Sequence, residues 1–224
     1  MNVSKLADAA RDLRYLLDRG YRRERVLDII VERYMLNKRE RSAVYRCVHS
    51  SLEAAEVRRK ISLRAESIAV DLFNCLITIV AMMRGEEFFL CDDCLVRDVR
   101  GSKLRKNEHE LAEKALSILS AAISIAKPKR LAIVAEKQIS NSAMYANLLR
   151  REVKCESVNV DVTEEVDSKL IELCRRGFCA ASTDIVIIRR CRCIYPLTTI
   201  CMHILDLRPL LDFASVLGSP CTMA

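Results

Sequence analysis

Apolar residues recur at helical spacing through the first part of the chain. One stripe advances by three and four residues and is formed by Leu6, Ala9, Ala10, Leu13, Leu16 and Leu17. This spacing predicts an amphipathic helix, which Gly20 would end in a left-handed conformation. A second stripe of the same kind follows and is formed by Val26, Leu27, Ile29, Ile30 and Tyr34.

A third helix is predicted to begin after Asn37. Glu40 stands three residues later, which is the spacing of a capping box, and Val44, Cys47 and Val48 supply an apolar face. We therefore expect a small three-helix module over residues 1–64. The short turn before the third helix is typical of a helix-turn-helix variant, and a plain helical bundle is the open alternative.

After residue 66 the pattern changes to short apolar runs that alternate with longer amphipathic stretches. The runs predict strands at residues 67–70, 88–91, 130–135, 157–162, 178–182 and 200–205. The stretches between them predict helices at residues 75–84, 108–126, 141–151, 164–175 and 185–190. Strands that alternate with helices indicate an α/β domain over residues 66–224, built on a mostly parallel sheet with helices on both faces.

Composition places the chain among globular proteins, since 51% of its 224 residues are hydrophobic and 30% are charged. The longest apolar stretches, at residues 75–83 and 118–126, are too short to cross a membrane. The first residues lack the apolar segment of a secretory signal, so we expect a cytoplasmic protein. A single Gln, no Trp and abundant Lys, Arg and Glu favour a thermophilic source.

Eleven cysteines leave two interpretations open. Cys91 and Cys94 form a CxxC pair, but no second pair lies at the distance of a structural zinc site. Most of the cysteines are expected to be small core residues, as with Cys75, Cys155 and Cys201. Because disulfides occur inside hyperthermophiles, one or two bridges are the other expectation.

The net charge of +7 is unevenly distributed. Residues 1–66 contain 16 Lys and Arg against 10 Asp and Glu, whereas the remaining 158 residues contain 21 against 20. A basic module beside a near-neutral domain favours an acidic partner, with nucleic acid first, although a solvated charged surface would have the same composition. If the third helix is a recognition helix, its outer basic residues are Lys38, Arg39, Arg41 and Arg46.

Acidic residues lie at or just after the carboxyl ends of five of the predicted strands. They are Asp71, the pair Asp92 and Asp93, Glu136, Asp161 and Asp184, with Asp167 at the start of a helix. The carboxyl ends of parallel strands share one edge of a sheet, where ligands bind. Carboxylates gathered there repel one another unless a cation is present, and Mg²⁺ or Mn²⁺ prefers such oxygen ligands. A single strand-end aspartate is more often a cap or turn residue, and we assign Asp98 and Asp161 to that role.

The sequence gives little support to nucleophilic catalysis or to a phosphate-binding loop. His49, His109 and His203 are scattered, and none neighbours a plausible Ser or Cys nucleophile. Five glycines leave no phosphate-binding glycine-rich loop.

Three short motifs carry a resemblance to known nucleases. Val70-Asp71-Leu72-Phe73-Asn74 resembles the D-x-x-N opening of PIN and NYN-type nucleases, and Ala181-Ser182-Thr183-Asp184 resembles their T-x-D signature. Asp167, followed by Leu170, resembles the acid at a helix start in PIN domains. Several further stretches, among them 12–21, 90–93 and 96–99, are similar to an archaeal family of unknown function.

The resemblance implies a PIN-like sheet with a metal-binding catalytic core of Asp71, Asp167 and Asp184. Asp92 or Asp93 would supply a further catalytic acid, and Asn74 and Thr183 would orient ligands and substrate. Three positions depart from the pattern. Glu136 stands where aspartate is usual, and Leu72 and Cys94 stand where glycine is common.

The sequence therefore predicts a metal-dependent ribonuclease that cleaves phosphodiester bonds with carboxylate-bound Mg²⁺ or Mn²⁺. RNA is the expected partner, held by the basic module. The alternative is a non-catalytic RNA-binding or assembly protein that retains the same fold.

Overall fold

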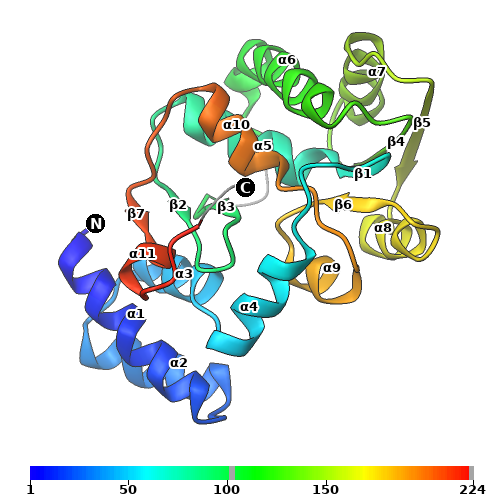
Figure 1. Cartoon of the computed structure of the whole chain (residues 1–224). Coiled ribbons are helices and arrows are strands. Elements are labelled where there is room, and N and C mark those ends of the chain that lie inside the picture. The colour runs from blue at the N-terminus through cyan, green and yellow to red at the C-terminus, as the bar shows by residue number, and fades with distance from the viewer. Residues whose placement is uncertain (101–103, 222–224) are drawn as a thin grey trace. The chain divides into compact units, whose positions relative to one another are not determined.

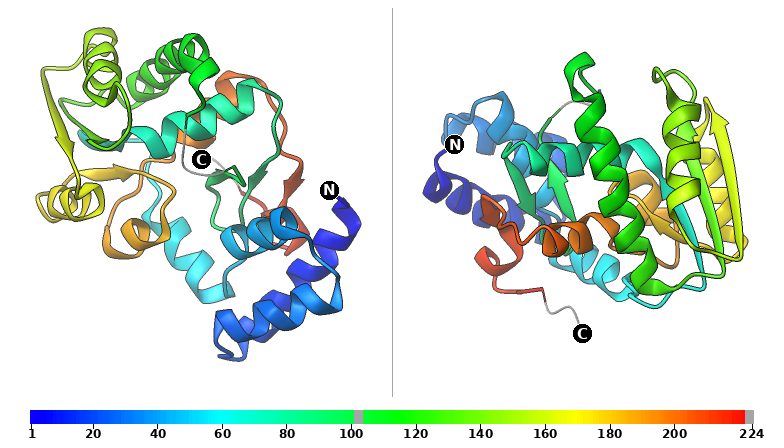
Figure 2. Two further views of the ribbon diagram at one scale, coloured as in Figure 1. Left: turned by 180° about the vertical axis from the view of Figure 1, so that it is seen from behind. Right: turned by 90° about the horizontal axis from the view of Figure 1, so that it is seen from above.

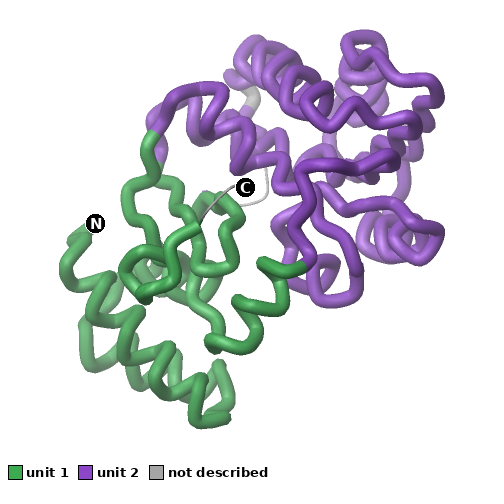
Figure 3. The backbone as a smooth tube through the Cα atoms, in the orientation of Figure 1, with its two compact units in different colours: residues 1–59, 87–99, 208–224 green, residues 60–86, 100–207 purple. Residues whose placement is uncertain are grey.

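The computed structural model describes residues 1–100 and 104–221, and the chain divides into two compact units (Figure 3). Unit 1 consists of Met1–Arg59, Glu87–Val99 and Arg208–Ala224. Unit 2 consists of Lys60–Glu86 and Arg100–Leu207. The predicted helical module thus supplies most of unit 1, and two later segments of the chain complete it.

Unit 1 begins with four helices, α1 (Val3–Asp18), α2 (Arg23–Arg33), α3 (Lys38–Cys47) and α4 (Ser51–Lys60). The first three are the predicted ones. The side chain of Asn37 accepts hydrogen bonds from the backbone N–H groups of Arg39 and Glu40, and the Glu40 carboxylate accepts one from Asn37. The predicted capping box is therefore confirmed, and it fixes where α3 begins.

A small sheet completes unit 1. Strand β2 (Phe88–Leu90) pairs antiparallel with β3 (Val96–Asp98) and parallel with β7 (Leu211–Asp212), which leads into the short helix α11 (Phe213–Val216). The rings of Phe89 and Phe213 lie 5.7 Å apart and are fully buried with the apolar faces of α1, α2 and α3. The predicted strand at residues 88–91 exists, but its assignment to the large parallel sheet is wrong.

Unit 2 contains the predicted parallel sheet, whose strands are β1 (Ser67–Asp71), β4 (Arg130–Glu136), β5 (Ser157–Thr163) and β6 (Cys179–Ala181). Their order is β5-β4-β1-β6. The helical elements of this unit are α5 (Leu72–Met83), a 3₁₀ turn η1 (Lys106–Glu108), α6 (His109–Ala126), α7 (Ser142–Glu152), α8 (Val166–Arg175), α9 (Ile185–Arg190) and α10 (Leu197–Ile204). Most residues of β1, β4 and β6 are buried because helices cover both faces (Figures 1, 2).

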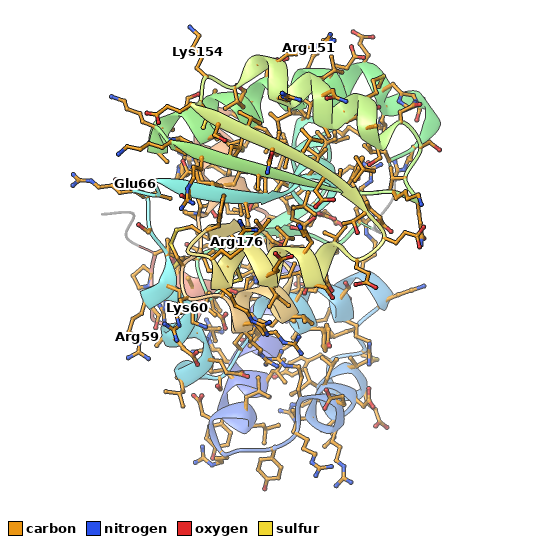
Figure 4. The ribbon with its side chains drawn as sticks, turned by 90° about the vertical axis from the view of Figure 1, so that its right-hand side faces the viewer. Arg59, Lys60, Glu66, Arg151, Lys154 and Arg176 are labelled. Carbon is orange, nitrogen blue, oxygen red and sulfur yellow. A yellow bond between two sulfur atoms is a disulfide. The ribbon has the colours of Figure 1, made fainter. Side chains whose placement is uncertain are left out.

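The strand order creates a switch point between β1 and β6. From β1 the chain proceeds outward to β4 and β5, and it then returns through α8 to place β6 on the other side of β1. Helices α6 and α7 accordingly lie on one face of the sheet and α8 on the other (Figure 4). Ligand sites of open α/β sheets lie beyond the carboxyl ends of strands at such a point.

The strand predicted at residues 200–205 is wrong, since residues 200–204 belong to helix α10 and Leu205 is its C-terminal cap. A short apolar run fits a buried strand and a buried helix equally well. The helix prevails because it packs against α5 and α6, with Leu197, Ile200 and Cys201 buried.

Three disulfides join Cys94 to Cys221, Cys174 to Cys191 and Cys179 to Cys193. The five other cysteines are free thiols. They include Cys75, Cys155 and Cys201, which were predicted to be small core residues. Among the described residues, no helix combines the length and the apolar character that a membrane span requires.

Candidate active site

Asp71 lies at the centre of the candidate site, at the last position of β1 and at the N-terminal cap of α5. Its carboxylate is buried and accepts a 2.8 Å hydrogen bond from the Ser182 hydroxyl and a 3.4 Å bond from the backbone N–H of Asn74. Because β1 and β6 are neighbours, Ser182, which follows β6, reaches Asp71 directly. The site therefore begins with a contact across the switch point.

Asn74 and Thr183 form a second contact across the same gap. The side-chain carbonyl of Asn74 accepts hydrogen bonds from the backbone N–H and the hydroxyl of Thr183, both at 2.9 Å. These two residues were predicted to orient ligands. The structure brings them together and bonds them to one another, so that they fix the first turn of α5 to the loop after β6.

Asp184 and Asp167 supply the remaining acids. Asp184 caps α9, where its carboxylate accepts a 2.7 Å hydrogen bond from the backbone N–H of Val186, and its own N–H donates to the Ser182 hydroxyl at 3.2 Å. Asp167 lies exposed in the first turn of α8. Acidic side chains at these positions stabilise the helix N-termini.

The charges of the three aspartates act on one another. Burial raises the pKa of Asp71 to about 7, against hydrogen bonds from Ser182 and Asn74 that lower it, and the charges of Asp167 and Asp184 raise it further. Partial desolvation and the charge of Asp184 also raise the pKa of the exposed Asp167, whereas Arg190 lowers it. Three carboxylates whose charges repel one another thus lie on elements at the carboxyl edge of the sheet, where a cation would relieve the repulsion.

The donor chemistry of this set fits a hard divalent cation, since all its acidic atoms are carboxylate oxygens. However, the described residues contain no group of three or more His, Cys, Asp or Glu side chains positioned to hold a metal ion. Asp71 and Asp184 instead use their carboxylates for caps and for Ser182. An ion would therefore have to draw these side chains together.

A cavity of about 580 Å³ lies at the end of β4, and none of the three aspartates lines it. Its walls are residues 137–144 and Val162. Glu136, which ends β4, pairs in register with Thr163 of β5 and does not line this cavity either. Asp71, and not this cavity, is the centre of the candidate site because the charges of Asp167 and Asp184 act on it.

Asp92 and Asp93, predicted as further catalytic acids, belong to unit 1 and not to this site. Asp92 is fully buried and accepts hydrogen bonds from Arg14 and from the backbone and ring of His49, the latter two at 2.6 Å. Asp93 forms a bidentate pair with Arg97 at 2.8 and 2.6 Å, which keeps the pKa of Asp93 low despite burial. Both carboxylates hold unit 1 together.

The basic residues predicted to contact substrate also lie in unit 1. Arg39 pairs with Glu87 at 2.8 Å, Arg41 pairs with Asp28 at 3.1 Å, and Arg46 donates to the carbonyl of Asp98. Lys38 is exposed at the start of α3. These pairs offset part of the positive charge on which the expected RNA contact depended.

Sequence reasoning missed Ser182 and Arg190. Ser182 belongs to the Ala181-Ser182-Thr183-Asp184 stretch, but its hydrogen bond to Asp71 depends on the pairing of β1 with β6. Arg190 lies six residues after Asp184, and only the packing of α9 against α8 brings its charge to Asp167.

Residues 60–200 match the family described as Domain of unknown function (DUF5616), and residues 5–60 match the family described as Protein of unknown function (DUF434). The chain is 30% identical over 166 residues to an uncharacterized protein of Methanocaldococcus jannaschii. The alignment covers 72% of this chain and 78% of that relative. No solved structure matches significantly. The expected relationship to an archaeal family of unknown function is confirmed, and Asp71, Asp167 and Asp184 lie within the longer match.

Proposed function

The chain belongs to the family described as Domain of unknown function (DUF5616), and from the site within the matched residues we propose that it is a metal-dependent ribonuclease of the PIN-like kind. In this proposal Asp71, Asp167 and Asp184 hold Mg²⁺ or Mn²⁺ and the substrate is RNA. Each of the three residues comes from a different element at the edge where α/β sheets bind ligands.

One observation carries the proposal. Asp71 is buried at the switch point of the sheet with a pKa of about 7, and the charges of Asp167 and Asp184 help to raise it. Mutual repulsion of this kind lowers the stability of the folded protein. Carboxylates that repel one another are commonly found where a protein binds a cation, because the cation offsets their charge. When bound, a divalent ion would activate a water molecule and offset the charge of the phosphodiester.

The chain's own residues orient the carboxylates. The Ser182 hydroxyl holds one oxygen of Asp71, and Ser182 also accepts the N–H of Asp184, so one side chain ties two of the acids together. The Asn74–Thr183 contact fixes the loop that carries Asp184. Asn74 and Thr183 are therefore positioning residues in this account, since they act through the aspartates.

A second candidate function is a non-catalytic RNA-binding or assembly protein on the same fold. It is favoured by the dispersed carboxylates, because no described group of acidic, His or Cys side chains is arranged to hold an ion. In this account Asp71 and Asp184 only cap α5 and α9.

Calorimetric titration with Mn²⁺ separates the two candidates. A nuclease of this kind binds Mn²⁺, and Asp167→Asn weakens that binding because one ligand loses its charge. Asp161→Asn is the matched control, since Asp161 lies on the same sheet but pairs with Lys169 at 3.2 Å. If wild type takes up no Mn²⁺, the non-catalytic candidate replaces the nuclease.

A further inference from the structure

Five exposed arginines gather around one disulfide of unit 2. They are Arg175, Arg176, Arg189, Arg190 and Arg192. From Arg175 to Cys193 the chain contains these five cations and a single acid, Asp184. Several of the arginines that make unit 1 basic form ion pairs with acidic residues. In unit 2, by contrast, the positive charge is concentrated on this one segment.

The disulfide between Cys174 and Cys191 brings the arginines together. The Cα atoms of the two cysteines lie 5.4 Å apart, which joins the last turn of α8 to the end of α9. Arg175 and Arg190 each adjoin one of these cysteines, and Arg192 follows Cys191 directly. Lys60 adds a further cation here, because its ammonium group donates to the carbonyls of Ile188 and Arg189 at 3.3 Å each.

Ion pairs with described residues offset only part of this charge. Arg176 pairs with Glu172 at 3.5 Å, which is a long and exposed contact. Within the described residues neither Arg175 nor Arg192 forms an ion pair. Stabilisation of helix C-termini accounts for basic residues in the last turns of α8 and α9, but not for Arg192, which lies beyond α9.

The cluster is connected to the candidate active site. Helix α8 carries Asp167 in its first turn and Arg175 in its last, and its ten residues span about 15 Å. Helix α9 ends at Arg190, begins after its cap Asp184 and packs against α8, so the cluster lies on the two helices that carry Asp167 and follow Asp184. The distance along α8 would accommodate a few consecutive phosphates of an extended strand.

We propose that these five residues form a surface, here named the α8–α9 arginine surface, which binds the phosphodiester backbone of a single-stranded polynucleotide. Closely spaced guanidinium groups suit the repeated anionic charge of such a backbone. This inference depends on the proposed function in one respect, namely that the surface would guide the strand to Asp167. The binding itself requires neither metal nor cleavage.

The test is a fluorescence anisotropy titration of the full chain with labelled oligouridine and, separately, labelled oligodeoxythymidine, in EDTA over a range of salt concentrations. The variant combines Arg175→Gln with Arg192→Gln. The matched control combines Arg150→Gln with Arg151→Gln, two exposed arginines in the last turn of α7 that carry the same charge. Figure 4 shows Arg151 across the sheet from Arg176.

We expect wild type to bind, with a dissociation constant that rises with salt. Loss of two phosphate contacts makes the slope of log Kd against log salt shallower by about 1.4 and weakens binding more than tenfold at about 0.1 M salt. The control retains the wild-type slope. Similar curves for RNA and DNA would indicate backbone recognition common to both, and a preference would identify which polynucleotide the surface serves.

Absence of binding by wild type, or equal effects of the two double variants, would overturn the proposal. Both results are independent of the catalytic assignment because EDTA removes metal ions. If the protein binds through Arg175 and Arg192 but does not cleave RNA, the proposed arginine surface stands and the proposed ribonuclease activity is refuted. Circular dichroism of each variant establishes that the exposed substitutions leave the fold intact.

Discussion

The hydroxyl of Ser182 donates a 2.8 Å hydrogen bond to Oδ2 of Asp71, a residue 111 positions earlier in the chain. The bond links the carboxyl end of β1 to the loop after β6, across the switch point of the parallel sheet. It also holds a carboxylate whose pKa is raised to about 7 by burial and, in part, by its acidic neighbours. This relationship leads to the first prediction.

The stability of the metal-free protein should fall as pH rises between about 4 and 7. The unfolded Asp71 carboxyl titrates near 3.9, whereas the folded one titrates at about 7, so between these values the folded state binds more protons. The penalty levels off above about pH 7 and is on the order of 4 kcal/mol at most. Asp71→Asn should remove it, as measured by urea denaturation in EDTA at several pH values.

Asp161→Asn is the control for this titration, because Asp161 is only half-buried and lies in the edge strand β5. It should leave the pH dependence of wild type in place. A protein whose stability declines equally with and without Asp71 would show that this carboxyl does not titrate as described.

Asp92→Asn should destabilise the protein by about 3–5 kcal/mol, because Arg14 would lose its fully buried counter-charge. The comparison is Asp8→Asn, which breaks only the exposed pair of Asp8 with Arg11 and should cost less than about 1 kcal/mol. Urea denaturation measures both. Mn²⁺ affinity should be unchanged in Asp92→Asn, and a loss of affinity would restore Asp92 to the catalytic set.

Thiol titration should find five reactive cysteines in the unfolded, unreduced protein and eleven after reduction. Cys174–Cys191 and Cys179–Cys193 close short loops around the segment that carries Asp184, and each is expected to contribute about 3 kcal/mol to stability. Urea denaturation with and without a reductant measures this contribution. Eleven reactive thiols before reduction would contradict the pairing.

Periodicity was sufficient to predict many of the regular elements, although the run at residues 200–205 was predicted as a strand and lies largely in helix α10. The helical stripes after Leu6 and Val26, the capping box at Asn37 and the runs at 67–70 and 130–135 are local patterns, and the corresponding elements formed there. Long-range pairing could not be predicted in the same way. The run at 88–91 pairs with β7, a strand more than a hundred residues later, and no local pattern distinguishes that partner from the parallel sheet.

The candidate site likewise combines residues that local sequence patterns identify with residues that only long-range packing identifies. Strand-end position sufficed to select Asp71 and Asp184, because the carboxyl ends of β1 and β6 meet at one edge. The same criterion selected Asp92 and Asp93, which follow β2 in unit 1. Their partners Arg14 and His49 are distant in sequence, so their structural role emerged only from packing.

RNA cleavage by wild type and by Asp184→Asn, with Mn²⁺ and with Mg²⁺, tests the central claim most directly. Replacement of a hydrogen-bonded neighbour of a metal ligand commonly costs 10–100-fold, so loss of the ligand's charge should lower the cleavage rate by about 100-fold or more. Asp161→Asn should cleave at the wild-type rate. Cleavage at equal rates by wild type and Asp184→Asn, or no cleavage by wild type with either ion, would contradict the assignment of this site as a metal-dependent ribonuclease.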